Sequence, residues 1–512
     1  MSDTSVSNAG AAPRRSLILA GGGMRVAYQA GVLKALSEAG MTFQHADGTS
    51  GGTMNLAMLL SGISPDEMCA RWRTLDVHRF ASSMPVEEYL RSWDMMGMGS
   101  ANGIREYVFP HLGIDLATIN AAQGMAGTFN VCNYSRKVAE VVPHQKVTLD
   151  LLVAGISLPI FMPPVNISGD WYTDAVWIKD ANLMEAVRRG AEELWVVWCI
   201  GNIHEYLPGA FYQYVHMIEM AANGRLFEEF ELIKEINSRI SAGERPFGLA
   251  SLIKLHVIKP VYPLPLDPDF FTGKITASTL TEMGYADACR YLEKEMTPAG
   301  LPFAPEATQM KSEGVGVTFS KAMQGGFTLG AKDAGDGYLR GQVAATLLTL
   351  HVTVRMHDAA EFISSPGAEA EVTGNISYPE FGDWIPLKNA ALTHLLASDG
   401  SGMVTMHYSM EFQHEGQEYR LCGEAQVRDT EAGDVLAGVT ELRCTLYRGT
   451  GAAAVVAGAG ILTLDASGVV EMVRTLHATN AHNIEQKTRA LYDFGRFYLR
   501  GIWDEHVSHL RP

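Results

Sequence analysis

The sequence predicts an α/β domain built on a parallel sheet, followed by a separate antiparallel β-rich domain, a sandwich or a barrel, that ends in a helix. From residue 16 to about residue 289, short apolar runs alternate with helical patterns, as in proteins with parallel sheets. After a stretch rich in Pro and Gly, strand patterns with period-two alternation dominate. The 512 residues also exceed what one compact core usually contains.

The domain boundaries follow from these changes in pattern. We expect a loose, disordered tail at residues 1–15, a first domain at 16–296, a linker at 297–316 and a second domain at 317–512. The tail lacks the apolar segment of a secretion signal, and no run approaches roughly 18 strongly apolar residues. The sequence therefore predicts a cytoplasmic protein without a membrane-spanning helix.

The elements of both domains can be placed by periodicity. In the first domain, the apolar runs 16–20, 193–200 and 255–261 predict strands, and 217–240 has the spacing of a surface helix. In the second domain, runs rich in Val, Thr, Leu and aromatic residues predict strands at 343–356, 403–412, 419–427, 441–447 and 460–464. The last predicted helix has one face formed by Ile484, Lys487, Leu491, Phe494, Tyr498 and Ile502, which we expect to pack against the rest of the protein.

Charge and cysteine usage exclude several functions. The formal charge of −17 makes unspecific binding to nucleic acid unexpected. The six cysteines include no CxxC pair, which argues against a zinc ribbon, a redox motif or a disulfide framework. His351, Arg355 and His357 lie close together, but without carboxylate support we interpret them as a solvated sheet face. We predict neither a metal nor a cofactor.

The first chemical signal is a glycine-rich turn. An apolar run at 17–20 leads into Gly21, Gly22, Gly23 and Arg25, and a helical pattern follows. Successive glycine N–H groups at a helix N-terminus can converge on an anion. The run lacks the Lys-Ser/Thr end of a P-loop and the full GxGxxG of a dinucleotide fold. It is either a phosphate cradle or an oxyanion hole, but taken alone it is better explained as a simple tight turn between a strand and a helix.

The second signal is a GxSxG pentapeptide, Gly48 to Gly52, with Ser50 at its centre and Gly51 beside it. Small neighbours allow such a serine to occupy a strained turn between a strand and a helix, where its hydroxyl is exposed to substrate. This turn comes one βα unit after the glycine-rich turn. Both turns therefore belong to the same edge of a parallel sheet, where a nucleophile and an oxyanion hole become neighbours.

A serine nucleophile also needs a base. None of the 16 histidines belongs to a motif that selects it, and isolated residues such as His204 and His256 are more often structural. An aspartate is the better candidate.

Three blocks in this order resemble the patatin-like phospholipase family, whose members use a serine and aspartate dyad without histidine. They are 21–25, similar to the family's GGGxR element, 48–52, similar to its nucleophile motif, and 157–174, similar to its approach to the catalytic aspartate. The resemblance covers about residues 16–292 and implies an α/β/α hydrolase domain. It implies that Ser50 is the nucleophile and Asp174 the base. It also implies an oxyanion element formed by Gly21, Gly22, Gly23 and Arg25, and a nucleophile turn with Gly48, Gly51 and Gly52.

The chain departs from the family after Asp174. The family usually has two small residues there, then an Asn-x-Pro, whereas this chain has Ala175 and Val176, then Asp180 and Asn182. Ala186 and the Gly-Ala pair at 190–191 keep the family's offsets, which supports the register on Asp174. Because a missing glycine can alter the turn that presents the carboxylate, Asp180 is the alternative base.

The resemblance implies a lipid acyl hydrolase of the phospholipase A or lipase/esterase type, acting on a lipid ester in the cytoplasm, with transient contact at a membrane surface or lipid body. Acyl transfer by the same nucleophile and non-catalytic lipid binding are the alternatives. The methionine-rich run at 93–99 is either an acyl-binding lid or ordinary core filling, and we favour core filling.

The second domain has no catalytic signature of its own. Its segments 327–330, 408–412, 419–423 and 494–503 are similar to a β-rich C-terminal region of some bacterial steroid oxidases of the glucose-methanol-choline type. This implies a lipid-binding or interaction role, and a structural or dimerising role is the alternative.

Overall fold

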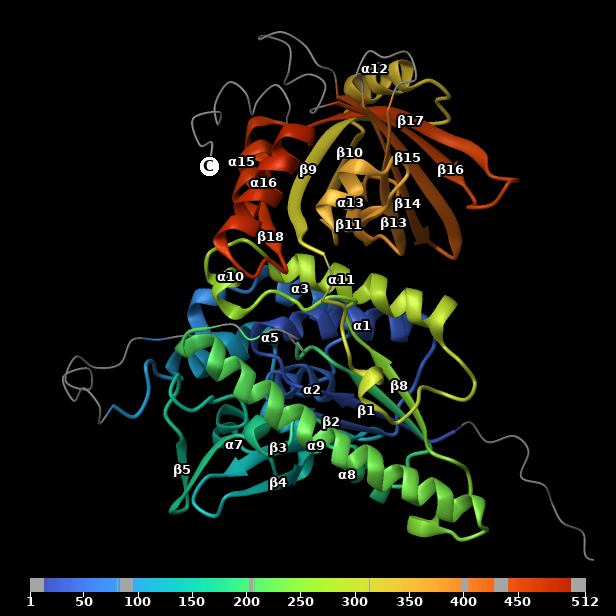
Figure 1. Cartoon of the computed structure of the whole chain (residues 1–512). Coiled ribbons are helices and arrows are strands. Elements are labelled where there is room, and N and C mark those ends of the chain that lie inside the picture. Colours follow the sequence, from blue (N-terminus) through green and yellow to red (C-terminus); the bar gives the residue numbers. More distant parts are fainter. Residues whose placement is uncertain are drawn as a thin grey trace, which may run out of the picture. The chain divides into compact units, whose positions relative to one another are not determined.

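The computed structural model describes most of the chain, in two compact units (Figure 1). Unit 1 comprises Met1–Ile203, Pro208–Leu264 and Lys294–Met310, and unit 2 comprises His204–Leu207, Pro265–Glu293 and Lys311–Pro512. The described residues are 13–80, 82, 95–201, 206, 208–312, 314–396, 404–427 and 441–498. The predicted tail at 1–15 lies almost wholly outside them. Residues 265–293, which we predicted to belong to the first domain, group with unit 2. The predicted domain boundaries, including the linker at 297–316, stay a prediction.

Unit 1 contains an eight-stranded mixed sheet in the order β5-β6-β3-β2-β1-β7-β8, with β4 paired to β3. Its centre is parallel, because β3, β2, β1, β7 and β8 all run in one direction, while β4, β5 and β6 pair antiparallel. The three strands predicted in this domain are confirmed. The strands are β1 (Arg15–Leu19), β2 (His45–Thr49), β3 (Ala126–Asn133), β4 (Val138–Pro143), β5 (Val165–Ile167), β6 (Asp170–Asp174), β7 (Glu193–Val197) and β8 (Lys254–Ile258).

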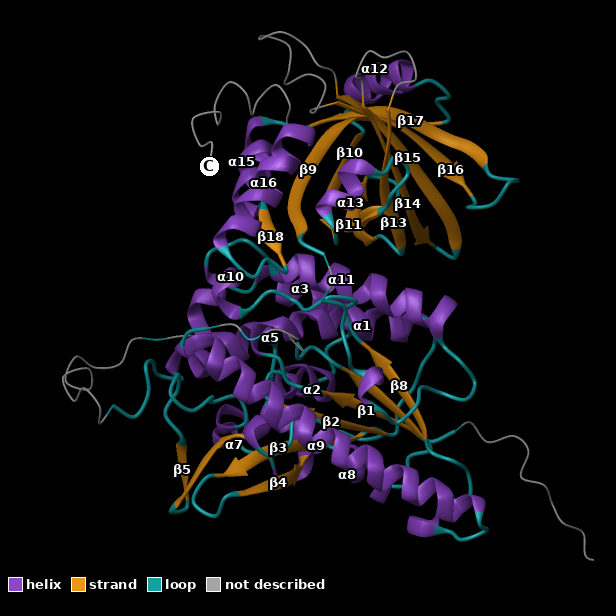
Figure 2. Cartoon of the chain, in the orientation of Figure 1, coloured by secondary structure: helices purple, strands orange, loops and turns teal. Residues whose placement is uncertain are grey.

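Helices lie on both faces of this sheet, which makes the α/β/α layers that were predicted (Figure 2). The predicted helix at 217–240 is the longer α9, which buries an apolar stripe from Ala222 to Ile240 in one core with Val196 of β7 and with Trp198, which follows this strand. Burying each large apolar side chain contributes roughly 1.5 to 3 kcal/mol. The helices are α1 (Ala27–Glu38), α2 (Gly52–Leu60), α3 (Pro65–Thr74), α5 (Phe109–Leu112), α6 (Leu116–Ala121), α7 (Leu149–Ala154), α8 (Leu183–Arg188) and α9 (Ala210–Ser241).

Unit 2 is a closed antiparallel barrel, so of the two predicted architectures the barrel is confirmed. Its strand β9 pairs with β10 along one edge and with β17 along the other, and the pairings from β10 through β11, β13, β14, β15 and β16 to β17 complete the circle. The strands are β9 (Gly316–Leu329), β10 (Leu347–Met356), β11 (Ala370–Tyr378), β12 (Gly382–Pro386), β13 (Asn389–Leu396), β14 (Val404–His414), β15 (Gln417–Val427), β16 (Glu441–Arg448), β17 (Val455–Thr463) and β18 (His477–Thr479).

Buried apolar residues alternate with more exposed residues along the barrel strands, and the buried ones fill the interior of the barrel. Along β14 every second residue from Val404 to Phe412 is buried, and these residues belong to one core with Phe319 and Phe327 of β9. The helices of this unit are α10 (Asp267–Phe271), α11 (Ala277–Arg290), α12 (Ala334–Ala344), α13 (Ala359–Ser364), α15 (Ala466–Thr475) and α16 (Ile484–Tyr498). The strand predicted to start at 343 starts at Leu347, because α12 continues to Ala344.

The predicted terminal helix is present as α16. Its Phe494, Phe497 and Tyr498 join the barrel core, as expected of a packing face. Ile484, however, is 83% exposed, so its assignment to that face is wrong. Ile502 lies outside the described residues.

The expectation of a solvated face at 351–357 is also wrong in part. Arg355 is buried and pairs with Glu371 at 2.7 Å, and His357 contacts the same carboxylate at 3.0 Å. Glu371 lies on the neighbouring strand β11, so no pattern within the run revealed it. None of the described helices combines the length and apolarity that crossing a bilayer requires.

Candidate active site

Ser50 occupies the turn between β2 and α2, as the GxSxG pattern predicts. Its backbone has φ of 52°, in the left-handed region that non-glycine residues adopt only at a cost in energy. A Cβ atom at Gly52 would lie 2.1 Å from the carbonyl oxygen of Leu19, so only glycine fits where α2 starts against β1. The turn therefore combines local strain with close backbone packing.

Asp174 is the last residue of β6 and lies directly beside this serine. The Ser50 hydroxyl donates to Asp174 Oδ2 over 2.6 Å, and the backbone N–H of Val176 donates to Oδ1 over 2.9 Å. Asp174 in this way caps the short 3-10 helix Ala175–Trp177. Ala175 and Val176 thus form a regular turn, and the carboxylate faces Ser50.

Burial raises the pKa of Asp174 to about 7, and the hydrogen bonds from Ser50 and Val176 oppose this rise. The carboxyl group is completely buried. A carboxylate with a pKa near neutrality is a stronger base than an exposed aspartate, which suits it to accept a proton from a hydroxyl group at neutral pH.

The glycine-rich turn lies next to Ser50. A Cβ atom at Gly21 would be 2.7 Å from the Cβ of Ser50, and one at Gly51 would be 2.7 Å from the carbonyl oxygen of Gly23. Within the described part of the chain, no group accepts a hydrogen bond from the N–H of Gly22 or Gly23. The predicted meeting of the two turns at one sheet edge is present, with two backbone donors available.

Arg25 braces this turn rather than facing solvent. Its side chain is buried, and its Nε donates to the carbonyl oxygen of Gly22 over 2.9 Å. Gln29 supports the same segment by donating to the carbonyl oxygen of Ala20 over 2.6 Å. Both contacts use side-chain N–H groups on carbonyls, so they leave the glycine N–H groups unoccupied.

Asp180, the alternative base, takes a different place. Its two carboxylate oxygens each lie 3.0 Å from the backbone nitrogen of Gly21, which donates to them. Burial, and then the neighbouring Asp174, raise the pKa of Asp180 to about 8. The Ser50 hydroxyl donates to Asp174, so of the two aspartates Asp174 is the one in contact with the serine.

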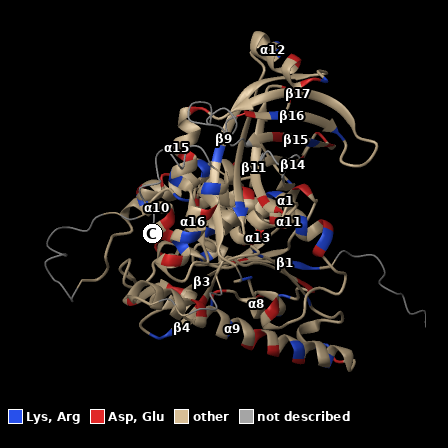
Figure 3. Ribbon diagram, turned by 45° about the horizontal axis from the view of Figure 1, so that its top comes forward, with Lys and Arg blue, Asp and Glu red and all other residues tan. Residues whose placement is uncertain are grey.

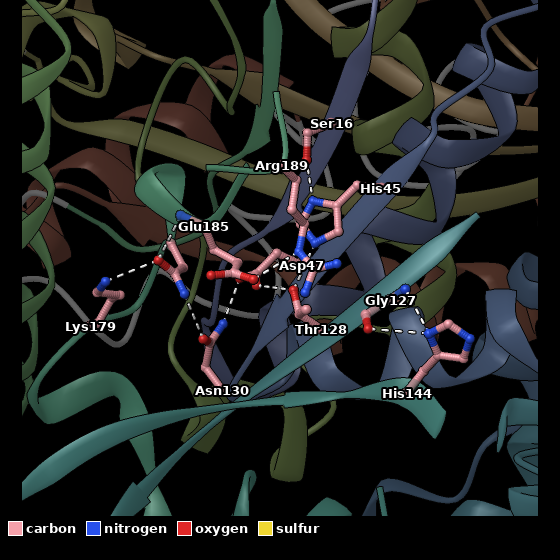
Figure 4. Close-up of polar contacts among 11 residues, drawn as sticks. Ser16, His45, Asp47, Gly127, Thr128, Asn130, His144, Lys179, Glu185 and Arg189 are labelled. Atoms are coloured by element: carbon pink, nitrogen blue, oxygen red, sulfur yellow. Dashed lines mark hydrogen bonds and ion pairs between the residues drawn. The ribbon is translucent and has the colours of Figure 1, made fainter. Parts of the chain in front are cut away.

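A buried polar network surrounds β2, the strand that leads into the serine turn (Figure 4). Asp47 of β2 accepts hydrogen bonds from Thr128 Oγ1 and Asn130 Nδ2, each over 2.5 Å. Because Thr128 donates to Asp47, its oxygen accepts from Nε2 of His45, and the hydroxyl of Ser16 donates to Nδ1 of the same ring. Burial raises the pKa of Asp47 to about 7 and lowers that of His45 to about 3. This network was not predicted, although its signal in the sequence is the alternation of polar residues along the buried strand β2.

Asn182 connects the network to the loop after Asp174. Its Nδ2 donates to Oδ1 of Asn130 over 2.9 Å, while its Oδ1 caps α8 by accepting from the N–H of Glu185. Asn130 in turn donates to the hydroxyl of Thr49 over 2.9 Å. The residue that stands where the family has proline therefore links the base loop to the strand that carries the serine.

Two histidines and the methionine-rich run are the remaining features that the sequence singled out. His256 stacks on Trp195, with ring centroids 4.2 Å apart, and burial lowers its pKa to about 4. His204 lies outside the described residues. Met95, Met96 and Met98 are 36%, 42% and 58% exposed, so core filling is the wrong interpretation for these three, and residues 93–94 lie outside the described part.

Comparison with known proteins identifies part of the chain. Residues 17–187 match the family model described as patatin-like phospholipase. Among solved structures, the chain is similar to VipD from Legionella pneumophila, at 12% sequence identity and a TM-score of 0.32, over 55% of this chain and 67% of that one. No curated protein matches the chain.

Proposed function

We propose that this chain, which carries a patatin-like phospholipase domain at residues 17–187, is a lipid acyl hydrolase of the phospholipase A or lipase/esterase type, with Ser50 as nucleophile and Asp174 as base. One observation carries the proposal: the hydroxyl of a serine on a strained turn donates to a buried carboxylate over 2.6 Å. No step of the proposed reaction requires a cofactor.

Each residue of the site has its own role in the proposed reaction. Asp174 accepts the proton of Ser50 while Oγ attacks the ester carbonyl, and the N–H groups of Gly22 and Gly23 hold the oxyanion. Asp174 returns the proton to the leaving alcohol, and the acyl group stays on Ser50. Asp174 then accepts a proton from the water that attacks the acyl carbonyl, and gives this proton to Oγ of Ser50 as the bond between Oγ and the acyl group breaks and the fatty acid is released. Losing one oxyanion donor usually costs roughly 3 to 4 kcal/mol of barrier.

An apolar rim beside Asp174 supports contact with a lipid surface. Residues 95–99 pair with 160–163, since Met98 N–H donates to Ile160 over 2.9 Å and Gly99 N–H to Phe161 over 3.0 Å. Ile160 is 60% exposed, like the neighbouring methionines. The rim adjoins the base, because the N–H of Asp174 donates to the carbonyl oxygen of Ser157 over 3.1 Å.

None of the described residues that form this rim has a charged side chain. Residues 95–104 and 155–167 contain no Lys, Arg, Asp or Glu, and neither does the start of α9 at 210–218, whose Phe211 and Tyr212 are exposed. Charged residues of both signs occupy the rest of α9 (Figure 3). In a chain of net charge −17, an uncharged apolar surface fits a zwitterionic or neutral lipid better than an anionic one. Peripheral contact by a cytoplasmic protein is therefore part of the proposal.

The experiment is hydrolysis of a p-nitrophenyl acyl ester series by wild type, Ser50→Ala, Asp174→Asn and Asp180→Asn, with fluorophosphonate labelling read as intact mass. We expect a single adduct in wild type that is absent in Ser50→Ala, and turnover lost in Ser50→Ala and Asp174→Asn. A folded wild type that neither turns over nor labels would contradict the proposal.

The same assay separates the alternatives. Transfer of the acyl group to an added thiol or alcohol in preference to water would indicate an acyltransferase. Lipid binding that Ser50→Ala leaves unchanged, with no turnover in either form, would indicate a non-catalytic lipid-binding protein. The lipid-binding or interaction role of unit 2, and its similarity to steroid oxidases, stay predictions.

A further inference from the structure

Asp180 is a buried carboxylate in the candidate active site to which the proposed reaction gives no role. It is completely buried, and both of its oxygens lie 3.0 Å from the backbone nitrogen of Gly21. Gly21 is the first residue of the turn whose next two N–H groups face no acceptor in the described chain. The carboxylate thus holds the glycine turn at the residue directly before the proposed oxyanion donors.

Gly21 packs closely against both Asp180 and Ser50. A Cβ atom there would lie 2.3 Å from Asp180 Oδ1, 2.7 Å from Ser50 Cβ and 3.2 Å from Ser50 Oγ. Asp180 and Ser50 therefore both lie against the α-carbon of Gly21. A small displacement of the turn changes the position of the N–H groups relative to the serine hydroxyl.

Residues on either side of Asp180 in the sequence anchor its loop. Lys179 forms a 2.8 Å ion pair with the buried Glu229 of α9, and Asn182 donates to Asn130 of β3. Lys179 Nζ also donates to Asn182 Oδ1 over 2.9 Å. The short loop between Asp174 and α8 is thereby fixed to both a helix and a strand, which makes it a rigid support for the carboxylate.

We propose that Asp180 is a positioning residue: by accepting the N–H of Gly21, it fixes the glycine turn so that the N–H groups of Gly22 and Gly23 are directed at the oxyanion that forms on Ser50 attack. This rests on the proposed hydrolase function. It differs from the role of a base, because Ser50 donates to Asp174 and the oxygens of Asp180 contact the backbone. The oxyanion exists only along the reaction path, so the effect belongs in kcat rather than in KM.

The test compares Asp180→Ala and Asp180→Asn by kcat, KM and the rate of fluorophosphonate labelling. We expect Asp180→Ala to lose about 100-fold in kcat, as for a lost oxyanion donor, with KM within about threefold. Asp180→Asn keeps an amide oxygen that can accept from Gly21, so we expect it to stay within about tenfold of wild type.

Glu193→Ala is the matched control. It removes another buried carboxylate from the same sheet, one that pairs with Arg15 at 2.8 Å at the start of β7, the sheet edge opposite to the serine turn. We expect lower stability and an unchanged kcat. The proposal would be overturned if Asp180→Ala had the kcat of wild type. It would also be overturned if Asp180→Asn were as inactive as Asp174→Asn, because that result would indicate proton transfer by Asp180.

A second measurement keeps the positioning claim separate from the hydrolase claim. Hydrogen–deuterium exchange of peptides covering residues 16–28 reports on the N–H of Gly21 whether or not the protein turns over substrate. We expect faster exchange in Asp180→Ala than in wild type, Asp180→Asn or Glu193→Ala. Equal exchange in Asp180→Ala and wild type would show that Asp180 does not hold the turn. A folded wild type without turnover or labelling would overturn the hydrolase claim, and Asp180 would then only hold the turn without serving an oxyanion.

Discussion

The side-chain amide of Asn182 donates to Oδ1 of Asn130 over 2.9 Å, and this contact joins the loop after Asp174 to the strand beside the serine turn. Both residues are completely buried. Neither a proline nor an alanine at position 182 could make this bond. Asn182, which departs from the pattern of the patatin-like sequences, therefore has a hydrogen-bond partner of its own in Asn130.

Asn182→Ala should destabilise the fold more than the loss of a helix cap alone. The change removes the cap of α8, which costs about 1 kcal/mol, and leaves Asn130 Oδ1 unpaired in the interior, which costs about 1 to 3 kcal/mol more. Urea unfolding measures the sum. Asp115→Ala, which removes only the exposed cap of α6, is the control. Equal losses in the two variants would contradict the expectation.

The pH dependence of hydrolysis should report the pKa of Asp174. This carboxyl must be ionised to accept the proton of Ser50, and burial raises its pKa to about 7. Activity should therefore rise with pH up to about 7 and fall as pH decreases through that value. We expect kcat/KM to show this acid limb while circular dichroism stays constant. A limb near pH 4 would indicate a solvated carboxylate instead.

Asp47→Asn should make the free energy of unfolding less dependent on pH, because the variant lacks the carboxyl group that loses its proton as pH rises. Burial raises the pKa of Asp47 from 3.8 to about 7, so the folded state binds this proton more tightly than the unfolded state does. Its contribution to stability is then present below about pH 4 and is lost as pH rises toward 7. Denaturant unfolding of wild type and Asp47→Asn at pH 5 and pH 8 measures the difference. The expectation fails if both proteins show the same pH dependence.

Met98→Glu should weaken activity on lipid surfaces selectively. Burying a methionine in a lipid contributes roughly 1.5 to 3 kcal/mol, so we expect at least about a tenfold loss on phosphatidylcholine vesicles. Hydrolysis of a soluble short-chain ester should not change. Leu232→Glu, at an exposed apolar position further along α9, is the control and should behave as wild type on both substrates. Equal losses on both substrates would argue against surface contact.

Local patterns predicted the parts of the site that lie within single turns. The glycine run and the GxSxG turn each encode a strand-to-helix turn, and the alternation of strands and helices is typical of the parallel sheet that brings them together. The hydrogen bonds of Asp180 with Gly21 and of Asn182 with Asn130 join residues far apart in sequence. No periodicity specifies such pairs, so only the folded chain reveals them.

The same limit applies to the second unit. Alternation predicted its strands, yet it did not decide between a sandwich and a barrel, because that choice depends on whether the first and last long strands pair. It also assigned Ile484 to a packed face that it does not join, since apolarity alone does not show where a helix meets its core.

The pairing of β9 with both β10 and β17 has a consequence for synthesis of the chain. Strand β9 is made first among the barrel strands, but one of its edges finds its partner only when Val455–Thr463 has been synthesised. Until then β9 and the growing end of the sheet each expose unpaired backbone groups, which are templates for association with other chains. We therefore expect a ribosome-bound or truncated chain that ends before Val455 to aggregate more readily than the full-length chain.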